Sequence, residues 1–172
     1  MEIKFSENNP KRLDLEYYED LSKVTKFLLI VGTMTMISGL INLLTGYFSL
    51  AIVSVTAIFV WSIYVWYAIT YHKPGAIFHA RALLIFTIVD YLLEIALVLY
   101  AGVFLQLIWK IAWMSLAGYC LYMVFSSSDV DEAFPEDYRK ASTFDIIFAS
   151  TIIGLPFLII GINIIRVLLK FM

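Results

Sequence analysis

The residues whose chemistry stands out in this sequence are three ionisable side chains inside long apolar stretches: Asp90, Glu94 and Lys110. Asp90 and Glu94 are four residues apart, so they share one face of a helix. If the chain reverses at Gly102, residues whose numbers add up to about 204 lie level with each other, and Glu94 and Lys110 meet this condition. At a rise of about 1.5 Å per residue, this pair lies about 12 Å from the turn, and Asp90 about 18 Å from it. Asp90 is then close to the centre of a bilayer.

Two interpretations of these three residues stay open. A lone charge at that depth costs at least about 2.5–3.5 kcal/mol, so such residues usually pair or mark a transport pathway. In the first interpretation, Glu94 and Lys110 form an ion pair that locks a helical hairpin, and Asp90 is protonated or hydrogen-bonded to a serine or threonine. In the second, Asp90 is a proton or cation site and the Glu94–Lys110 pair is its gate.

The composition indicates that most of this chain lies in a lipid bilayer. Of the 172 residues, 62% are apolar and only 15% are charged, and positions 27–71 contain no charge at all. Ordinary soluble domains are about 45–50% apolar, and a chain of this size cannot bury so much apolar surface by itself. A soluble enzyme is therefore excluded. The single cysteine excludes a disulfide scaffold, and the net charge of −2 without a basic patch excludes a nucleic-acid binder.

We therefore expect an all-α, polytopic integral membrane helical bundle with five transmembrane helices. About 20 apolar residues are needed to cross about 30 Å of hydrocarbon. The predicted spans are 27–46, 50–71, 82–101, 103–125 and 146–165. Short connections make the first four spans two antiparallel pairs. In the fifth, Gly154 and Pro156 predict a kink, so a re-entrant segment is the alternative there.

The distribution of lysine and arginine predicts the orientation, because short cytoplasmic loops are enriched in both. Nine of them fall on the side of the N-terminus: Lys4, Lys11, Arg12, Lys23, Lys26, Lys73, Arg81, Arg139 and Lys140. Only Arg166 and Lys170 flank the opposite side. We expect a bacterial-type plasma (inner) membrane protein with a cytoplasmic N-terminus and the C-terminus outside. No cleavable signal peptide is predicted, since the first apolar run already has the length of a span.

Small and hydroxyl-bearing residues form a stripe on the first span. They recur at helical spacing at Gly32, Thr35, Ser38, Gly39, Asn42 and Gly46. Such residues let helix backbones approach and hydrogen-bond to each other, so we expect this stripe to pack against another helix. A substrate path is the alternative.

Two polar segments lie outside the predicted spans. In the N-terminal segment 1–26, an amphipathic helix is expected over 10–28, capped by Asn9. Its apolar face is formed by Leu13, Tyr17, Leu21, Val24 and Leu28, and it either lies on the cytoplasmic leaflet or docks a partner. The loop 126–145 carries six carboxylates and no glycine, which does not fit a calcium-binding EF-hand loop. It is expected to be a solvated acidic linker with one helical turn capped by Ser128.

No catalytic, metal or cofactor site is predicted. His72 and His79 could ligate a metal or haem at the cytoplasmic edge, but no further histidine supports this. Both are expected to be interfacial loop histidines. Cys120 lies within the fourth span without a partner cysteine, and it is interpreted as a small apolar residue.

A short motif, Ser127-x-x-Val130-x-x-x-Phe134, follows a span rich in tryptophan and tyrosine. With the basic loop and the acid-bearing third helix before it, the stretch 66–134 resembles a bacterial four-helix integral membrane family of unknown function. The chain departs from that family at Asp129 and Asp131, where the family has basic residues, and by its fifth helix. The resemblance implies no activity that can be transferred to this chain.

These observations lead to two functional expectations. The first is a non-enzymatic anchor, assembly or regulatory subunit that acts through its cytoplasmic face. Its partner would be another membrane or cytoplasmic protein or a second copy of the chain, besides the lipid bilayer. The alternative is a small oligomeric channel or a proton- or cation-coupled transporter built around Asp90. A membrane enzyme ranks third, and no cofactor is expected.

Overall fold

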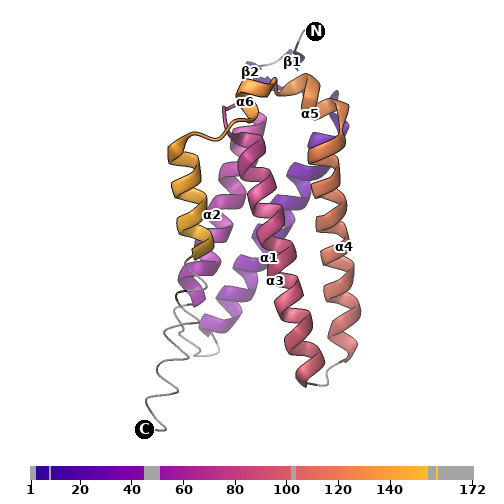
Figure 1. Ribbon diagram of the computed structural model, residues 1–172, viewed down its shortest axis with the longest axis vertical. Helices are drawn as coiled ribbons and strands as arrows, with labels where there is room; N and C mark the ends of the chain where they lie inside the picture. Colours follow the sequence, from indigo (N-terminus) through magenta and orange to yellow (C-terminus); the bar gives the residue numbers. More distant parts are fainter. Residues whose placement is uncertain (1–2, 8, 45–50, 102–103, 155–157, 159–172) are drawn as a thin grey trace.

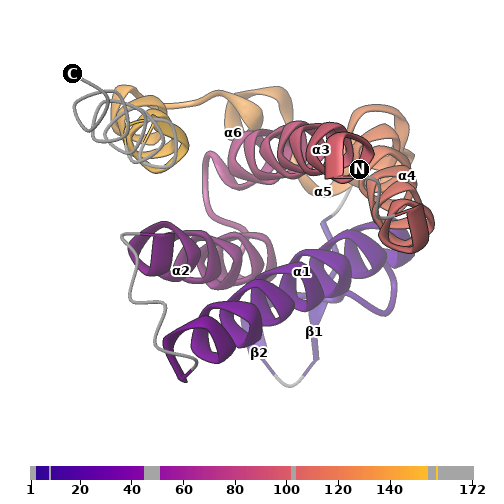
Figure 2. The same cartoon turned by 90° about the horizontal axis from the view of Figure 1, so that it is seen from below.

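The computed structural model describes residues 3–7, 9–44, 51–101, 104–154 and 158. Four long helices lie side by side as two antiparallel pairs, α1 with α2 and α3 with α4 (Figures 1 and 2). Their bounds are α1 Glu19–Leu44, α2 Ala51–Thr70, α3 Ala76–Ala101 and α4 Phe104–Ser126. A further helix begins at Thr143, is described as far as Gly154, and runs beside α2 (Figure 1).

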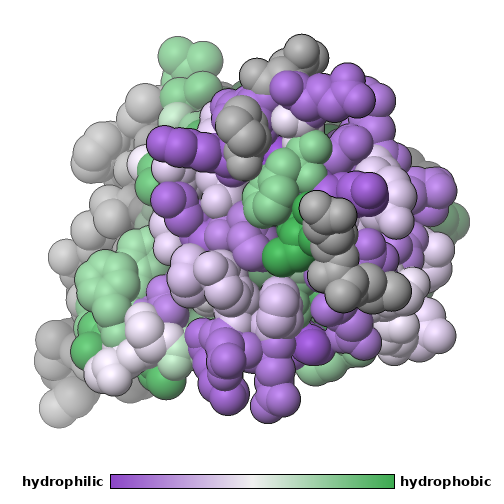
Figure 3. Space-filling model, turned by 90° about the horizontal axis from the view of Figure 1, so that it is seen from above, coloured by the Kyte–Doolittle hydropathy of each residue, from purple (hydrophilic) through white to green (hydrophobic). Residues whose placement is uncertain are grey.

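One end of the bundle is covered by short elements: β1 Phe5–Ser6, β2 Asn9–Leu13, α5 Ser128–Ala133 and α6 Glu136–Arg139. Together with the α2–α3 turn they form what we call the cap, residues 3–7, 9–18, 71–75 and 127–142 (Figure 1). Viewed from this end, the surface is mainly hydrophilic (Figure 3). β1 and β2 pair as a two-stranded antiparallel sheet, so the expectation of a purely α-helical chain was wrong at this point.

Three of the helices are long and apolar enough to cross a membrane. The qualifying stretches are Glu19–Ile41 in α1, Ala76–Ala96 in α3 and Leu107–Ser126 in α4. In α2 the apolar stretch Val55–Thr70 is shorter. The chain is thus a mainly helical bundle of the kind expected in a membrane. Half of the predicted fifth span, residues 155–157 and 159–165, lies outside the described residues.

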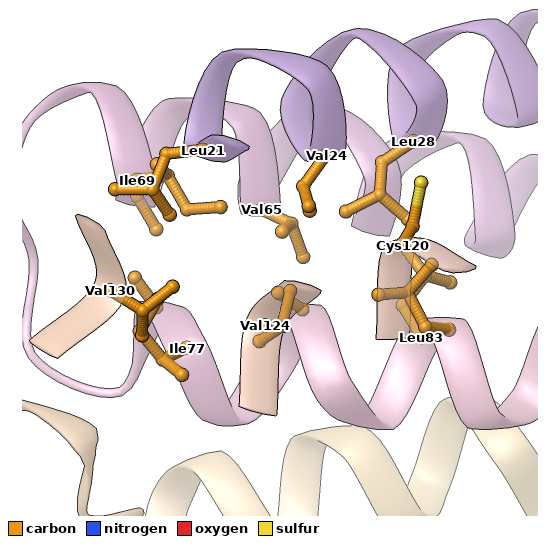
Figure 4. Close-up of a cluster of buried hydrophobic side chains, with 14 of the residues drawn as sticks. Leu21, Val24, Leu28, Val65, Ile69, Ile77, Leu83, Cys120, Val124 and Val130 are labelled. Carbon is orange, nitrogen blue, oxygen red and sulfur yellow. The ribbon is translucent and has the colours of Figure 1, made fainter. Parts of the chain in front are cut away.

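The apolar core lies in the half of the bundle next to the cap. It brings together side chains from α1 to α5 (Figure 4). Representative members are Leu21, Val24, Leu28, Val65, Ile69, Ile77, Leu83, Cys120, Val124 and Val130. Beyond the level of Val31, Trp61, Thr87 and Ala117, the side chains that the structure describes in the four helices are partly or wholly exposed, and only Gly32 and Gly39 are buried. In this half, away from the cap, the α1–α2 pair and the α3–α4 pair diverge (Figures 1 and 2).

The predicted amphipathic helix over 10–28 is wrong for residues 10–18. Residues 9–13 pair with β1, and α1 begins only at Glu19. The turn before α1 is organised by Asp14, whose Oδ1 accepts hydrogen bonds from the backbone N–H groups of Glu16 and Tyr17 at 3.1 and 3.3 Å. As a result Tyr17 is 53% exposed, and its neighbour Tyr18 is fully buried. Asn9 is not a helix N-cap, because the residues that follow it form strand β2 and pair with β1.

The loop 126–145 is not the solvated linker that we expected. Ser127, rather than Ser128, caps α5, since its side chain accepts a hydrogen bond from the backbone N–H of Asp129. Val130 and Ala133 of α5 and the following Phe134 are buried against the bundle. The apolar residues within this acidic segment therefore fold it onto the cap end of the bundle.

Two glycines of the predicted packing stripe lie where α1 and α2 approach closely. A Cβ atom on Gly32 would meet Ser62 Cβ at 2.6 Å, and one on Gly39 would meet Val55 Cγ1 at 2.6 Å. The Thr35 hydroxyl donates to the carbonyl oxygen of Val31 in its own helix, and Ser38 is exposed. Gly46 and the Asn42 side chain lie outside the described part of the chain.

Candidate functional site

The Glu94–Lys110 pair joins α3 to α4. Lys110 Nζ donates to Glu94 Oε2, as the register of the hairpin predicts. The ammonium group of Lys110 also lies 5.4 Å from the centre of the Tyr91 ring, where a cation is attracted to the ring's π face. Both side chains are partly exposed, Glu94 by 38% and Lys110 by 23%.

Asp90 lies one turn from this pair. Its side chain is exposed, and no hydrogen bond or ion pair involves it among the residues that the structure describes. The expected hydrogen bond to a serine or threonine is therefore not found in that part of the chain. The structure thus separates the three residues into a neutralising pair and one carboxyl group that has no partner among the described residues.

These residues continue the face of α3 that forms the core. Two helical turns, or seven residues, separate Leu83 from Asp90, and the same spacing separates Thr87 from Glu94. On α4, Lys110 precedes the buried Ala117 by the same interval. The charged cluster thus lies on the inner faces of the two helices, just past the point where the core ends.

A second polar cluster surrounds His79, which is buried and belongs to α3. The expectation that His79 is an interfacial loop histidine is wrong, because α3 begins at Ala76 instead of residue 82. His79 Nε2 lies 2.9 Å from Oδ1 of Asp145. Trp61 Nε1 donates to His79 Nδ1 at 3.3 Å. The aromatic rings around the imidazole belong to Trp61, Tyr64, Phe78 and Phe148.

These contacts fix the tautomer of His79. An indole N–H is only a donor, so the Nδ1 atom that faces Trp61 must be the unprotonated nitrogen. The ring proton of the neutral imidazole then lies on Nε2 and is donated to Asp145. The network ties α2, α3 and the helix that begins at Thr143 into one unit.

Asp145 is held in place by a capping box at the start of its helix. The backbone N–H and hydroxyl group of Ser142 donate to Asp145 Oδ2 at 2.8 and 2.7 Å, and the backbone N–H of Asp145 donates to the Ser142 hydroxyl. Burial opposes ionisation of Asp145, but the hydrogen bonds from Ser142 and His79 outweigh it and hold its pKa below the ordinary value. The spacing Ser142-x-x-Asp145 before an apolar run is a capping-box signal that could have been read in the sequence.

The cap is fastened to the start of α1 by two reciprocal hydrogen bonds. The backbone N–H of Asp20 donates to Asp129 Oδ2 at 2.9 Å, and the Ser127 hydroxyl donates to Asp20 Oδ2 at 2.7 Å. Asp129 thereby satisfies one of the free N–H groups at the N-terminus of α1, where a negative charge is favourable. In the motif Ser127-x-x-Val130-x-x-x-Phe134, Ser127 is the N-cap of α5. Val130 and Phe134 are buried apolar side chains.

His72 fastens the other side of the cap. Its Nε2 lies 2.7 Å from the carbonyl oxygen of Ala133, and its ring stacks on Tyr138 with centroids 4.6 Å apart. Burial lowers the pKa of His72, and the Ala133 carbonyl acts in the opposite direction. The residue has a φ of 49°, and Gly75 of the same turn has a φ of 76°.

Within the described ranges, no group of three or more histidine, cysteine, aspartate and glutamate side chains could hold a metal ion. Comparison with protein-family models, curated proteins and solved structures finds no match to this chain. The resemblance of residues 66–134 to a four-helix bacterial membrane family therefore stays a prediction.

Proposed function

We propose that this protein is a non-enzymatic subunit of the plasma membrane, an anchor, assembly or regulatory component that binds its partner through the cap. The observation that carries this proposal is that the cap is folded. The N-terminal segment, predicted to be an amphipathic helix, and the acidic loop, predicted to be a solvated linker, are both packed onto the bundle through Tyr18, Val130 and Phe134. A surface that is already ordered loses little conformational entropy when a partner binds.

The proposed topology has five spans, with the cap on the cytoplasmic side. The charge distribution supports it, because all nine lysine and arginine residues outside the spans and before residue 146 belong to the cap or to helix turns next to it. A reporter inserted near Ser142 should be cytoplasmic, and a reporter after Met172 extracytoplasmic. Both reporters on one side of the membrane would show that the fifth span does not cross.

The face of the cap formed by α6 has the character of an interface. Glu136 and Asp137 have side chains that are 84% and 90% exposed, and Tyr138 is 37% exposed beside them. Tyrosine is enriched in binding hot spots, and the carboxylates would steer a basic partner surface toward it.

The experiment is purification of the native complex in mild detergent from cells that make the wild-type chain or a variant. Glu136→Lys combined with Asp137→Lys should reduce stoichiometric co-purification of the partner at least about tenfold, which corresponds to 1.4 kcal/mol. The matched control is Glu16→Lys with Glu19→Lys, the same charge change at the start of α1, and it should retain the partner. Absence of any stoichiometric partner, or equal retention by both variants, would contradict the proposal.

A channel or proton- or cation-coupled transporter is the second candidate, and the exposed carboxyl group of Asp90 favours it. Its test is ion flux into liposomes that contain only the purified chain. Flux that is lost in Asp90→Asn would establish transport and displace the subunit proposal. Flux that is absent from the wild-type chain removes this candidate.

A further inference from the structure

We propose that the space between the two helix pairs, in the half of the bundle away from the cap, receives a transmembrane helix of the partner. This helix carries a lysine or arginine level with Asp90. The inference rests on the proposed function, because it names a feature of the partner that the cap would bind. It concerns a different surface, which lies within the membrane.

The inner faces of α3 and α4 change from apolar to polar along their length. Next to the cap, these faces are formed by Leu83, Leu84 and Ala117, all fully buried. Seven residues further along α3, Leu83 is followed by Asp90 and Leu84 by Tyr91. A surface that changes from aliphatic to charged within two turns is built for polar contacts at that depth.

The described residues leave this surface uncovered. The α1–α2 and α3–α4 pairs diverge away from the cap (Figures 1 and 2), and Asp90 is exposed. Apolar side chains such as Leu92, which is 51% exposed, are stable in contact with lipid tails. A carboxylate is not stable there, because lipid tails offer it no hydrogen bond or counter-charge.

The helix that occupies this space must bring a positive charge. Glu94 and Lys110 neutralise each other, so within the described part of the chain Asp90 is the acidic side chain of this cluster that has no counter-charge beside it. A second copy of the chain would not supply a free cation, since Lys110 is the only lysine or arginine in the predicted spans 27–46, 50–71, 82–101, 103–125 and 146–165. Two copies would bring like charges together, so the complementary occupant is a different helix with one basic residue.

A metal ion does not fit this surface as well as a helix does. A bound cation needs several oxygen ligands, whereas no metal-binding group of acidic, histidine and cysteine side chains occurs in the described ranges. A lysine or arginine side chain needs only one carboxylate partner, and its helix fills the remaining space with apolar contacts.

The experiment uses the purified full-length chain in liposomes and a synthetic leucine–alanine helix of about 20 residues with one arginine at its centre. Energy transfer between labels on the two molecules reports association. The arginine helix should bind at least about tenfold more tightly than a helix with leucine at the same place. Asp90→Asn, which keeps the shape of the side chain, should reduce its binding to the level of the leucine helix. Glu19→Gln, which removes an exposed carboxylate at the start of α1, is the matched control, and it should bind like the wild-type chain.

Equal binding of both helices, or unchanged binding of the arginine helix by Asp90→Asn, would overturn the inference. Self-association of the chain that depends on Asp90, or ion flux that Asp90→Asn abolishes, would overturn it as well. The two proposals fail separately. A native partner that is lost with the α6 variant, together with no preference for the arginine helix, removes only the inference. A preference for the arginine helix, together with a native partner that the α6 variant retains, removes only the role of the α6 face.

Discussion

His79 Nε2 lies 2.9 Å from Asp145 Oδ1, although 66 residues separate them in the chain. His79 is on α3, and Asp145 is in the first turn of the helix that follows the cap. Trp61 of α2 donates to the other ring nitrogen. One imidazole therefore connects three helices within a shell of aromatic rings.

Replacing this imidazole should destabilise the bundle. His79→Leu leaves the indole N–H of Trp61 without an acceptor and removes one donor from Asp145, and an unsatisfied buried polar group costs about 1–3 kcal/mol. We expect a loss of this size in the free energy of unfolding, measured in detergent. In a Trp61→Phe background, which already lacks the indole donor, His79→Leu should cost less. Equal costs in both backgrounds would show that Trp61 and His79 are not coupled.

Stability should fall as the pH is lowered from 7 to 5, and His72 should cause part of this change. Because the pKa of His72 is lowered in the folded chain, the unfolded chain takes up its proton first, at about pH 6.5. Protonation of the unfolded state then favours unfolding. His72→Asn should flatten the dependence of the melting temperature on pH, since asparagine tolerates the positive φ but does not titrate. A slope that is equally steep in this variant would contradict the assignment.

Asp145 acts in the same direction in a lower range of pH. Its pKa is depressed in the folded chain, so its contribution to stability is fully present above about pH 3.9. The contribution is lost as the pH falls through the folded pKa. Any slope between pH 7 and 5 that remains in His72→Asn is therefore not due to Asp145.

Gly75 should not tolerate alanine. Its φ is 76°, and a Cβ atom there would meet Asp145 Oδ2 at 2.7 Å. Gly75→Ala should therefore lower the free energy of unfolding by about 1–3 kcal/mol through backbone strain and displacement of the carboxylate. Gly118 in α4 is the control, because a Cβ atom on it would meet nothing within 4 Å. Gly118→Ala should be neutral or stabilising, since alanine is favoured over glycine in a helix by about 1 kcal/mol. Equal effects of both changes on the midpoint of unfolding would contradict this account.

Glu94 and Lys110 should behave as one energetic unit. Glu94→Gln and Lys110→Met each leave one charge without its partner, at a cost of about 2.5–3.5 kcal/mol at membrane depth. The double variant leaves no charge, so its loss of stability should be smaller than the sum of the two single losses. A double-mutant cycle of unfolding in detergent measures the difference. Additive losses would mean that the two side chains do not interact in the membrane-embedded protein.

Features that depend on neighbouring residues or on a short hairpin could be predicted from the sequence. Apolar runs place the long helices, because the energy of burying apolar side chains in lipid depends on their number and spacing. The Glu94–Lys110 pair follows from the position of the α3–α4 reversal, since an antiparallel register is set once the turn is known. The close approach at Gly32 and Gly39 follows from the small size of glycine.

Contacts between distant segments required the tertiary structure. Asn9 and Pro10 favour the start of a helix locally, but pairing with β1 and burial of Leu13 hold these residues in a strand. Asp129 reads as one more charge of an acidic loop, yet it caps α1 because Phe134 anchors that loop on the bundle. His79 and Asp145 meet only because the helix that carries Asp145 packs against α2 and α3. In each case the deciding energy comes from burial between segments far apart in the chain, and local sequence carries no record of which segments will touch.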